Sequence, residues 1–111
     1  MRRLLCALML LWTASLPLAQ QRSIDDFFRE FSDGWVRINP DAAVATRYFT
    51  GVEQDRLEQQ LTSYTDAAER ERREYVRRGL GNLARFDRAR MTDAERLSVD
   101  LLRYQLQTYL D

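Results

Sequence analysis

The chain has 111 residues, enough for one small domain, and 45% of them are apolar, which is typical of a globular protein rather than a disordered one. It carries 17 basic and 17 acidic residues, and without residues 1–19, which hold Arg2 and Arg3 but no acid, its net charge is −2. That balance argues against nucleic-acid binding, whose affinity depends on excess cationic charge. There is no histidine, and the only cysteine is Cys6, so residues 20–111 lack the commonest general base, the commonest zinc ligand and any thiol.

Residues 1–19 have the three-part pattern of a secretory signal peptide. Arg2 and Arg3 give a positive start, residues 4–16 form an uncharged apolar run, and Ala19 offers a small residue at the cleavage site. The run is about thirteen residues long, shorter than the roughly twenty that a permanent membrane-spanning helix needs. We therefore expect cleavage after Ala19, export to a bacterial periplasm or beyond, and no stable membrane span in the processed chain. An uncleaved N-terminal anchor is the alternative.

Residues 20–111 show helical periodicity and no convincing strand pattern, which predicts an all-α fold of four to five helices. The first helix should begin at Ser23, with Asp26 at capping-box spacing. Its apolar residues form one stripe that leaves Gly34 off it, namely Ile24, Phe27, Phe28, Phe31, Trp35 and Ile38. Core packing is the main interpretation of this stripe, and a ligand-facing aromatic surface is the alternative.

Two short helices should follow. Asn39 and Pro40 end the first helix and begin the next, with Asn39 as the cap and Pro40 in the first turn. We expect that second helix over residues 41–49. A third piece, over residues 53–61, is either continuous with the long helix that follows or broken from it near Thr62.

A long helix is expected from about Thr65 to Phe86, because Thr65 caps an acidic first turn. Its predicted buried side comprises Tyr64, Ala68, Tyr75, Val76, Leu80, Leu83 and Phe86. Gly79 and Gly81 interrupt this helix at a cost of up to about 1 kcal/mol each relative to alanine. Such a cost is tolerable if a partner helix crosses at that point.

The final helix should begin at Thr92, where Glu95 completes a second capping box. Its apolar residues fall on one side at Leu97, Leu101, Tyr104 and Thr108, and beside it at Leu102, Leu106 and Tyr109. The pattern still runs at Asp111, without a glycine, asparagine or basic residue that would close the helix. We therefore expect residues 20–111 to be an incomplete domain, the front segment of a larger all-helical bundle.

The most visible polar feature is a run of arginines on and after the long helix. They are Arg70, Arg72, Arg73, Arg77, Arg78, Arg85, Arg88 and Arg90. A basic strip for phosphate, nucleic acid or lipid head groups would explain them. Three acid-first i,i+4 pairs favour a solvated helix face instead, since each such pair stabilises a helix by a few tenths of a kcal/mol. The predicted pairs are Asp66–Arg70, Glu69–Arg73 and Glu74–Arg78.

Candidate catalytic groups are few. Neighbouring carboxylates that an acid/base pair would require occur at Asp25 and Asp26, at Asp55 and Glu58, and at Glu71 and Glu74. Each pair is better explained as helix-cap or surface charge. The chain has no glycine-rich phosphate loop, serine nucleophile elbow or metal-ligand spacing of histidine or cysteine. The sequence therefore predicts no catalytic, cofactor-binding or metal-binding residue, and no cofactor, in this chain.

Several blocks of the mature chain resemble a known family in their order and spacing. They are residues 39–46, 48–51 and 53–57, residues 79–87 with Gly79, Leu80, Leu83, Phe86 and Asp87, and residues 92–106 with Arg96, Ser98, Asp100, Leu101 and Gln105. Together, residues 27–106 resemble the N-terminal region of the bacterial family known as domain of unknown function 885. Its members are mostly exported, largely helical and similar to zinc metallopeptidases of the gluzincin type. The resemblance covers most of the mature chain and a minor front portion of the family's domain.

The resemblance implies a full-length zinc-dependent peptidase or hydrolase that acts on peptides, in which a His-Glu-x-x-His helix supplies two zinc ligands and a glutamate base. No residue of this chain takes those roles, because it contains no histidine. We therefore interpret residues 20–111 as a non-catalytic N-terminal helical segment whose partner is the remainder of its own polypeptide. Two alternatives remain: a stand-alone periplasmic helical module that binds a protein or dimerises through its aromatic face, and an arginine strip that binds anionic membrane lipid.

Overall fold

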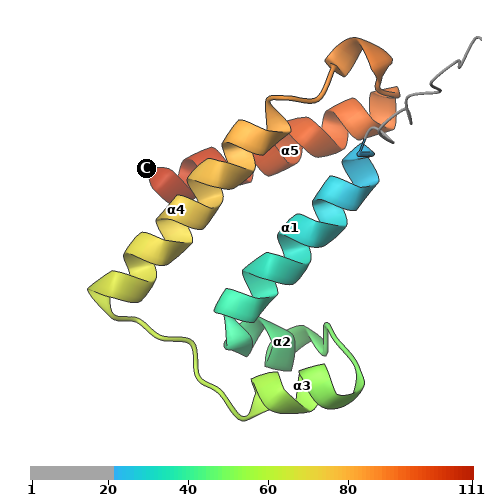
Figure 1. The fold of residues 1–111 in the computed structure, drawn as a ribbon. Helices are drawn as coiled ribbons and strands as arrows, with labels where there is room; N and C mark the ends of the chain where they lie inside the picture. The colour runs from blue at the N-terminus through green and yellow to red at the C-terminus, as the bar shows by residue number, and fades with distance from the viewer. Residues whose placement is uncertain (1–21) are drawn as a thin grey trace, which may run out of the picture.

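The computed structural model describes residues 22–111, and every regular element within them is helical (Figure 1). The α-helices are α1 (Ile24–Ile38), α2 (Pro40–Thr46), α3 (Gly51–Glu58), α4 (Asp66–Leu83) and α5 (Asp93–Leu110), and a short 3-10 helix, η1 (Arg88–Arg90), precedes the last of them. The predicted all-α fold is thus confirmed for this part of the chain. The expected signal peptide, residues 1–19, lies outside the described residues.

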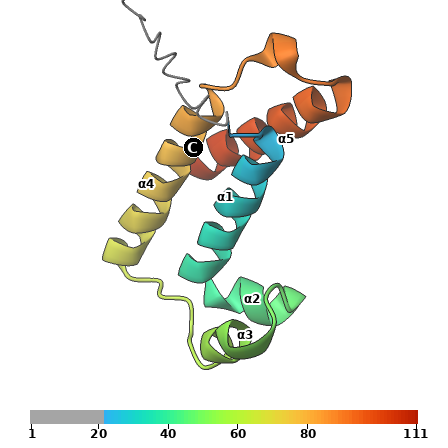
Figure 2. The same cartoon turned by 45° about the vertical axis from the view of Figure 1, so that its right-hand side comes forward.

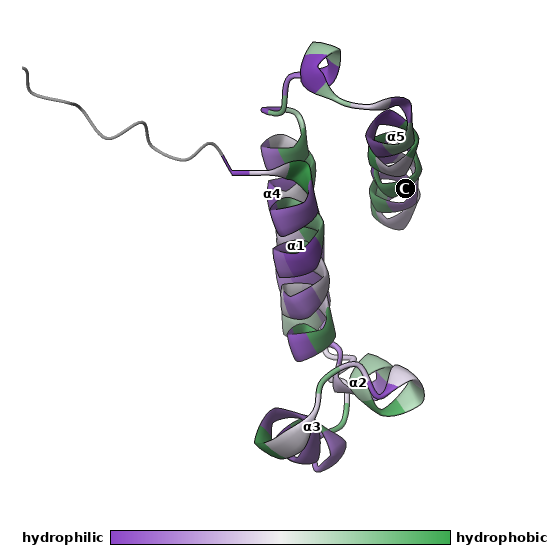
Figure 3. Ribbon diagram, turned by 90° about the vertical axis from the view of Figure 1, so that its right-hand side faces the viewer, coloured by the Kyte–Doolittle hydropathy of each residue, from purple (hydrophilic) through white to green (hydrophobic). Residues whose placement is uncertain are grey.

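The helices form an open, layered arrangement. Helices α1 and α4 lie side by side and run in opposite directions, and α2 and α3 extend from the C-terminal end of α1 (Figure 1 and Figure 2). Turned by 90°, α1 and α4 overlap, and α5 lies to one side of them as a second layer (Figure 3). Two separate apolar cores result, one built on Ile24, Phe27, Leu83, Met91 and Val99 and the other on Val36, Ala43 and Leu57.

Helix α1 begins where the sequence predicts. The Ser23 hydroxyl oxygen accepts a hydrogen bond of 3.0 Å from the backbone N–H of Asp26, and the same hydroxyl donates to the Asp26 carboxylate at 2.7 Å. This cap satisfies a free N–H of the first turn. One turn on, Phe27 is 2% exposed, and its ring lies 5.6–6.0 Å from the rings of Phe28, Phe31 and Phe86. The core role predicted for the aromatic stripe is therefore confirmed at this end of α1.

Two glycines allow α1 and α4 to approach closely. Gly79 of α4 is buried under the Phe31 ring, whose Cδ2 atom would lie 3.0 Å from a Cβ placed on that glycine. This agrees with the prediction that a partner helix crosses there. Gly34 of α1 faces Tyr75 in the same way, and a Cβ there would overlap the phenol. The prediction that Gly34 lies off the packing stripe was therefore wrong. The packed side of α1 includes Gly34, because the Tyr75 ring occupies the space that a side chain at position 34 would fill.

Helices α2 and α3 are shorter than predicted and form a small unit at the end of α1. The second helix ends at Thr46 rather than Phe49, since Arg47 adopts a left-handed conformation (φ 49°) and turns the chain. Asn39 is the N-cap residue of α2 and Pro40 lies in its first turn, as predicted. The Asn39 side chain makes no cap hydrogen bond to α2; its amide donates to the Trp35 carbonyl at 2.9 Å and so closes α1. The buried Gln54 joins α3 to α2 by donating to the Ala43 carbonyl at 2.9 Å.

Helix α4 is separate from α3, which confirms the predicted alternative of a break near Thr62. The Thr65 hydroxyl caps it by accepting from the Ala68 N–H at 3.3 Å. Tyr64 was predicted to lie on the buried side but is 80% exposed, because it precedes the helix in an extended segment. Gly81 is also exposed, with open space around its Cα, so the crossing inferred for both glycines occurs only at Gly79.

Helix α5 has the predicted capping box, in which Thr92 and Glu95 exchange hydrogen bonds of 3.2 and 2.7 Å. Its buried side was only partly predicted. Leu106 is buried and Leu102 and Tyr109 are partly buried, but the deepest residue is Val99, at 1% exposed. The side predicted through Leu97, Leu101, Tyr104 and Thr108 faces away from the core and is exposed. The helix has two apolar sides, and periodicity alone does not tell which one meets α4.

Candidate functional site

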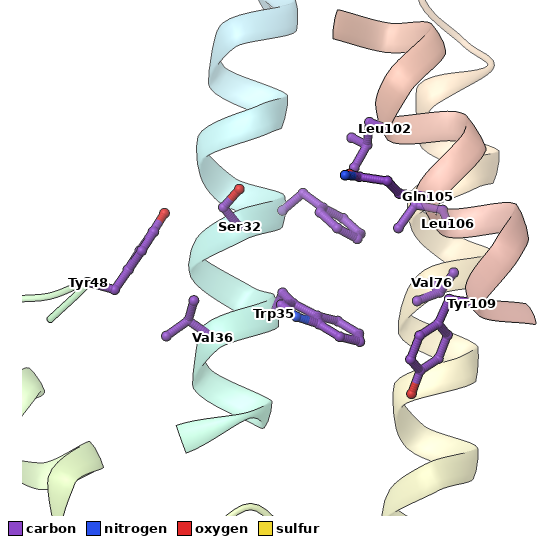
Figure 4. A pocket seen from close by; sticks show the side chains of 10 residues that line it. Ser32, Trp35, Val36, Tyr48, Val76, Leu102, Gln105, Leu106 and Tyr109 are labelled. Carbon is purple, nitrogen blue, oxygen red and sulfur yellow. The ribbon is translucent and has the colours of Figure 1, made fainter. Parts of the chain in front are cut away.

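A groove lies between α1 and α5, with Val76 of α4 at its floor (Figure 4). Its volume of about 410 Å³ is in the range of sites that hold a small ligand or a few side chains. The residues that line it are Phe31, Ser32, Trp35, Val36, Tyr48, Val76, Leu102, Gln105, Leu106 and Tyr109. None of them is charged, so the groove suits an uncharged, largely apolar occupant.

Aromatic rings form the wall of this groove where α1 and α5 face one another. The rings of Trp35 and Tyr109 meet edge to face, with centroids 5.3 Å apart and planes at 87°, a favourable arrangement for aromatic pairs. Behind them, the Tyr75 ring lies 5.0 Å from that of Phe31 and 6.3 Å from that of Trp35. The helices thus contribute one continuous aromatic surface from positions far apart in the sequence.

A few polar groups are available inside the groove. Within residues 22–111, neither the indole N–H of Trp35 nor the side-chain amide of Gln105 has a hydrogen-bond partner, and no polar side-chain atom is both buried and unpaired. These two groups therefore remain solvated, and both can donate to a carbonyl oxygen. An apolar occupant that carries backbone carbonyls, such as a peptide, matches this combination.

Tyr48, in the loop between α2 and α3, is also a lining residue and lies beside α1 (Figure 4). The Tyr48 hydroxyl donates to the Asp33 carboxylate at 2.8 Å, and an ion pair of 2.7 Å between Arg37 and Glu53 holds the first turn of α3 to α1. Burial, followed by the hydrogen bond to Asp33, raises the pKa of the Tyr48 phenol above its usual value. The phenol therefore stays protonated and keeps donating to α1 at neutral pH.

A polar cluster fixes the α5 side of the groove to the first turns of α4. The Tyr109 hydroxyl lies 3.2 and 3.3 Å from the two carboxylate oxygens of Glu69, to which it donates. Arg72 donates to Glu69 at 2.9 Å and to the Ser63 carbonyl at 2.6 Å. Hydrogen bonds from Arg72, and then from Tyr109, hold the pKa of the Glu69 carboxyl below its usual value. Tyr109 is thus held in place by a carboxylate that is ionised at neutral pH.

Arg73 adds a second link by donating to the Tyr109 and Leu110 carbonyls. These carbonyls lie in the last turn of α5, where a cation is favourable because the C-terminal end of a helix carries partial negative charge. The sequence offered no residue near position 110 for this role. The structure supplies it from α4, which local sequence rules do not detect.

The arginine run is not the uniform solvated face that we predicted. Arg72 is only 5% exposed and belongs to the cluster around Glu69, where its guanidinium also lies 5.6 Å from the Tyr64 ring. The three predicted i,i+4 pairs are not the ones formed. The ion pairs within α4 join residues three apart, Arg72 with Glu69 and Arg77 with Glu74. The arginines therefore divide into structural and surface residues.

The candidate carboxylate pairs have local roles. Asp26 belongs to the α1 cap, Glu58 accepts from Gln54 at 2.8 Å, and Glu74 pairs with Arg77. In the part of the chain that the structure describes, no group of three or more His, Cys, Asp or Glu side chains is placed to hold a metal ion.

None of the helices from α1 to α5 is long and apolar enough to cross a membrane.

Several residues of the groove were not predicted from the sequence to lie at a binding surface. Tyr48, Ser32 and Gln105 face the groove but belong to no apolar stripe, and they come from three different elements. The sequence feature that pointed to this surface was the high number of aromatic residues on α1. That signal gave the ligand-facing interpretation as an alternative, and Phe31 and Trp35 are among the residues that line the groove.

Comparison with known proteins adds no identity. No protein-family model matches the chain, and neither a curated protein nor a solved structure matches it significantly.

Proposed function

We propose that residues 20–111 are the non-catalytic N-terminal helical segment of an exported protein that resembles a zinc-dependent peptidase or hydrolase, and that the groove between α1 and α5 forms part of a peptide-binding wall. In this proposal the zinc ligands and the catalytic base come from the remainder of the polypeptide. The signal-peptide pattern of residues 1–19 and the family resemblance of residues 27–106 support this proposal.

The groove is the single observation that carries the proposed peptide binding. Its walls are aromatic and uncharged, and the donors of Trp35 and Gln105 lie among apolar side chains. Extended peptides are recognised through side chains in apolar pockets together with hydrogen bonds to their backbone carbonyls. A charged polymer such as a nucleic acid would instead require arginines inside the groove, and the lining contains none.

Trp35 provides a direct test, because the other tryptophan, Trp12, lies within the predicted signal peptide. The processed chain is titrated with uncharged peptides rich in leucine and phenylalanine while Trp35 fluorescence is recorded. We expect a saturable change in emission. The variant Gln105→Arg, which places a charge in the groove, should lose this response. Gln107→Arg, the same substitution on an exposed residue of α5 outside the lining, should keep it.

Two results would count against peptide binding: no peptide giving saturation, or Gln105→Arg behaving like Gln107→Arg. The larger claim is tested separately by sequencing the coding region beyond codon 111. We expect it to continue in frame and to encode a His-Glu-x-x-His motif. A continuation without that motif would exclude the zinc-peptidase resemblance even if peptides bind.

A second candidate is a stand-alone helical module that binds a protein partner. The observation in its favour is that the described helices have their own caps and their own buried cores. Thermal unfolding of the processed chain tests it. A sharp, cooperative transition supports an autonomous module, whereas a broad transition with dye binding supports a segment that needs the remainder of its polypeptide.

A further inference from the structure

Helix α5 has an outer apolar stripe that no part of the described structure covers. Leu97, Leu101 and Tyr104 follow one another at spacings of four and three residues, so they lie on one side of the helix. They are 61%, 56% and 69% exposed, whereas Val99 on the opposite side is 1% exposed. Because α5 forms a layer of its own, its outer side faces away from α1 and α4 (Figure 3).

The two edges of this stripe differ in charge. One edge carries Asp93, Arg96, Asp100 and Arg103, whose charges alternate in sign along the helix. Within one chain, Arg96 pairs with Asp93, and Asp100 pairs with Arg103 and Arg88, so contact with another charged edge requires these surface pairs to exchange partners. The other edge carries Ala94, Ser98 and Gln105, all uncharged, and leads into the groove. Depletion of charge beside exposed leucine and tyrosine is typical of the centre of a protein interface, and a charged rim is typical of its border.

We propose that this outer face of α5 binds the α5 of a second copy of the chain, with the two helices antiparallel. An edge that alternates in sign is its own complement when it is reversed, since Asp93 then lies near Arg103 of the other copy and Arg96 lies near its Asp100. The antiparallel arrangement brings the two charged edges together and the two uncharged edges together. A parallel pair would place each charged edge against an uncharged one.

The same register also matches the apolar side chains in size. With Arg96 near Asp100 of the other copy, Leu101 packs against Leu97 of that copy. Tyr104, at the end of the stripe, then lies over the small side chain of Ala94. Large residues thus meet small ones at both ends, and leucines meet at the centre, as close packing of two helices requires.

The expected dimer is weak. In this register the two helices overlap over about thirteen residues, or roughly 20 Å. Such a contact covers on the order of 1,000 Å² in total, at the lower limit of specific interfaces and well below the standard size of about 1,600 Å². We therefore expect a concentration-dependent dimer with a Kd on the order of micromolar. This inference does not depend on the proposed function, because it concerns the opposite side of α5 from the core and needs no ligand in the groove.

The first test is sedimentation equilibrium of the full chain in a Cys6→Ser background. We expect a monomer–dimer equilibrium that Leu101→Asp weakens at least about tenfold, since a charge would lie at the centre of the apolar contact. Leu61→Asp is the matched control, because Leu61 is 88% exposed and lies outside α5. Circular dichroism of both variants should remain that of the wild type. A chain that stays monomeric at millimolar concentration, or one that both variants affect equally, would overturn the proposal.

The second test reports the register. Chains with Leu97→Cys and chains with Leu101→Cys, distinguished by a size tag and otherwise free of cysteine, are mixed and oxidised. The antiparallel dimer predicts disulfides mainly between unlike chains, because Leu97 of one copy packs against Leu101 of the other. Glu74→Cys, on the exposed side of α4, should not cross-link. Links mainly between like chains would show that the helices are parallel and that the proposed interface is wrong.

Discussion

Substitution of the two α4 glycines by alanine separates a packing requirement from a helix-propensity cost. Gly79 and Gly81 lie two residues apart in the same helix, and alanine should favour the helical state at both. Their surroundings differ, however. The Cβ of an alanine at position 79 would overlap the Phe31 ring, whereas at position 81 it would meet no atom within 4 Å. We expect Gly79→Ala to destabilise the fold and Gly81→Ala to stabilise it.

The magnitude follows from two opposing terms. Removing glycine from a helix interior favours folding by about 0.5–1 kcal/mol at either position. At position 79 the overlap must be relieved by moving Phe31, which is held between Phe27 and Tyr75 with ring centroids 6.0 and 5.0 Å away. Overpacking of this kind costs typically about 1–3 kcal/mol. The two variants should therefore differ by about 1–3 kcal/mol in the free energy of unfolding.

Urea unfolding of the processed chain measures this difference, with helix content followed by circular dichroism and the α1–α4 contact followed by Trp35 fluorescence. Thermal unfolding can be used in place of urea, since for a domain of this size a difference of 1 kcal/mol in the free energy of unfolding corresponds to about 4–8 °C in Tm. Gly81→Ala serves as the control for helix propensity. Equal shifts for the two variants would refute the close approach of α1 to α4 at Gly79, and with it the position of the groove floor.

Three further changes test other parts of the structure. Thr92→Ala should lower the free energy of unfolding by about 1 kcal/mol because it removes the α5 cap, whereas the exposed Thr108→Ala should change it by less than about 0.5 kcal/mol; urea unfolding of both variants checks this. Tyr75→Phe, measured in the same way, should cost about 1 kcal/mol, since its hydroxyl donates to an α1 carbonyl at 2.8 Å. The bond from Arg72 lowers the pKa of Glu69 from 4.5, so its contribution is present above that pH and lost as pH falls through the folded-state pKa. Glu69→Gln should therefore flatten the fall in Tm below pH 4.5, and an unchanged profile would contradict the cluster.

Much of the fold could be predicted from the sequence because its signals are local. Ser23, Thr65 and Thr92 each cap a helix as predicted. A hydroxyl followed by an acid within the first turn is a reliable signal, because the hydroxyl accepts from a free backbone N–H of that turn. The aromatic stripe likewise identified the core side of α1. The ends of the short helices were less predictable. Arg47 ends α2 because its backbone is left-handed. Arginine seldom adopts this conformation, and no neighbouring residue predicts it.

The site depends on contacts between distant residues, and these have no local signal. Nothing in the sequence separates the buried Arg72 from the exposed Arg70. The link from this cluster to α5 is made by Tyr109, forty residues after Glu69, and no local pattern predicts it. The same holds for the two sides of α5. Both sides are apolar enough to be buried, so composition alone does not tell that the side at Val99 is the buried one.

The groove remains open for a reason that can be traced to individual residues. Helix α1 belongs to both cores: its first turns pack on α4 and α5, and its last turns pack on α2 and α3. The end of α5 is joined to α4 by hydrogen bonds of Tyr109 and Arg73, and to α1 by the ring contact of Tyr109 with Trp35. Between these attachments, the facing positions of α1 and α5 include Ser32 and Gln105, which are polar where a closed bundle would have apolar residues. Polar side chains at these two positions oppose closure into an apolar contact, which accounts for the open groove.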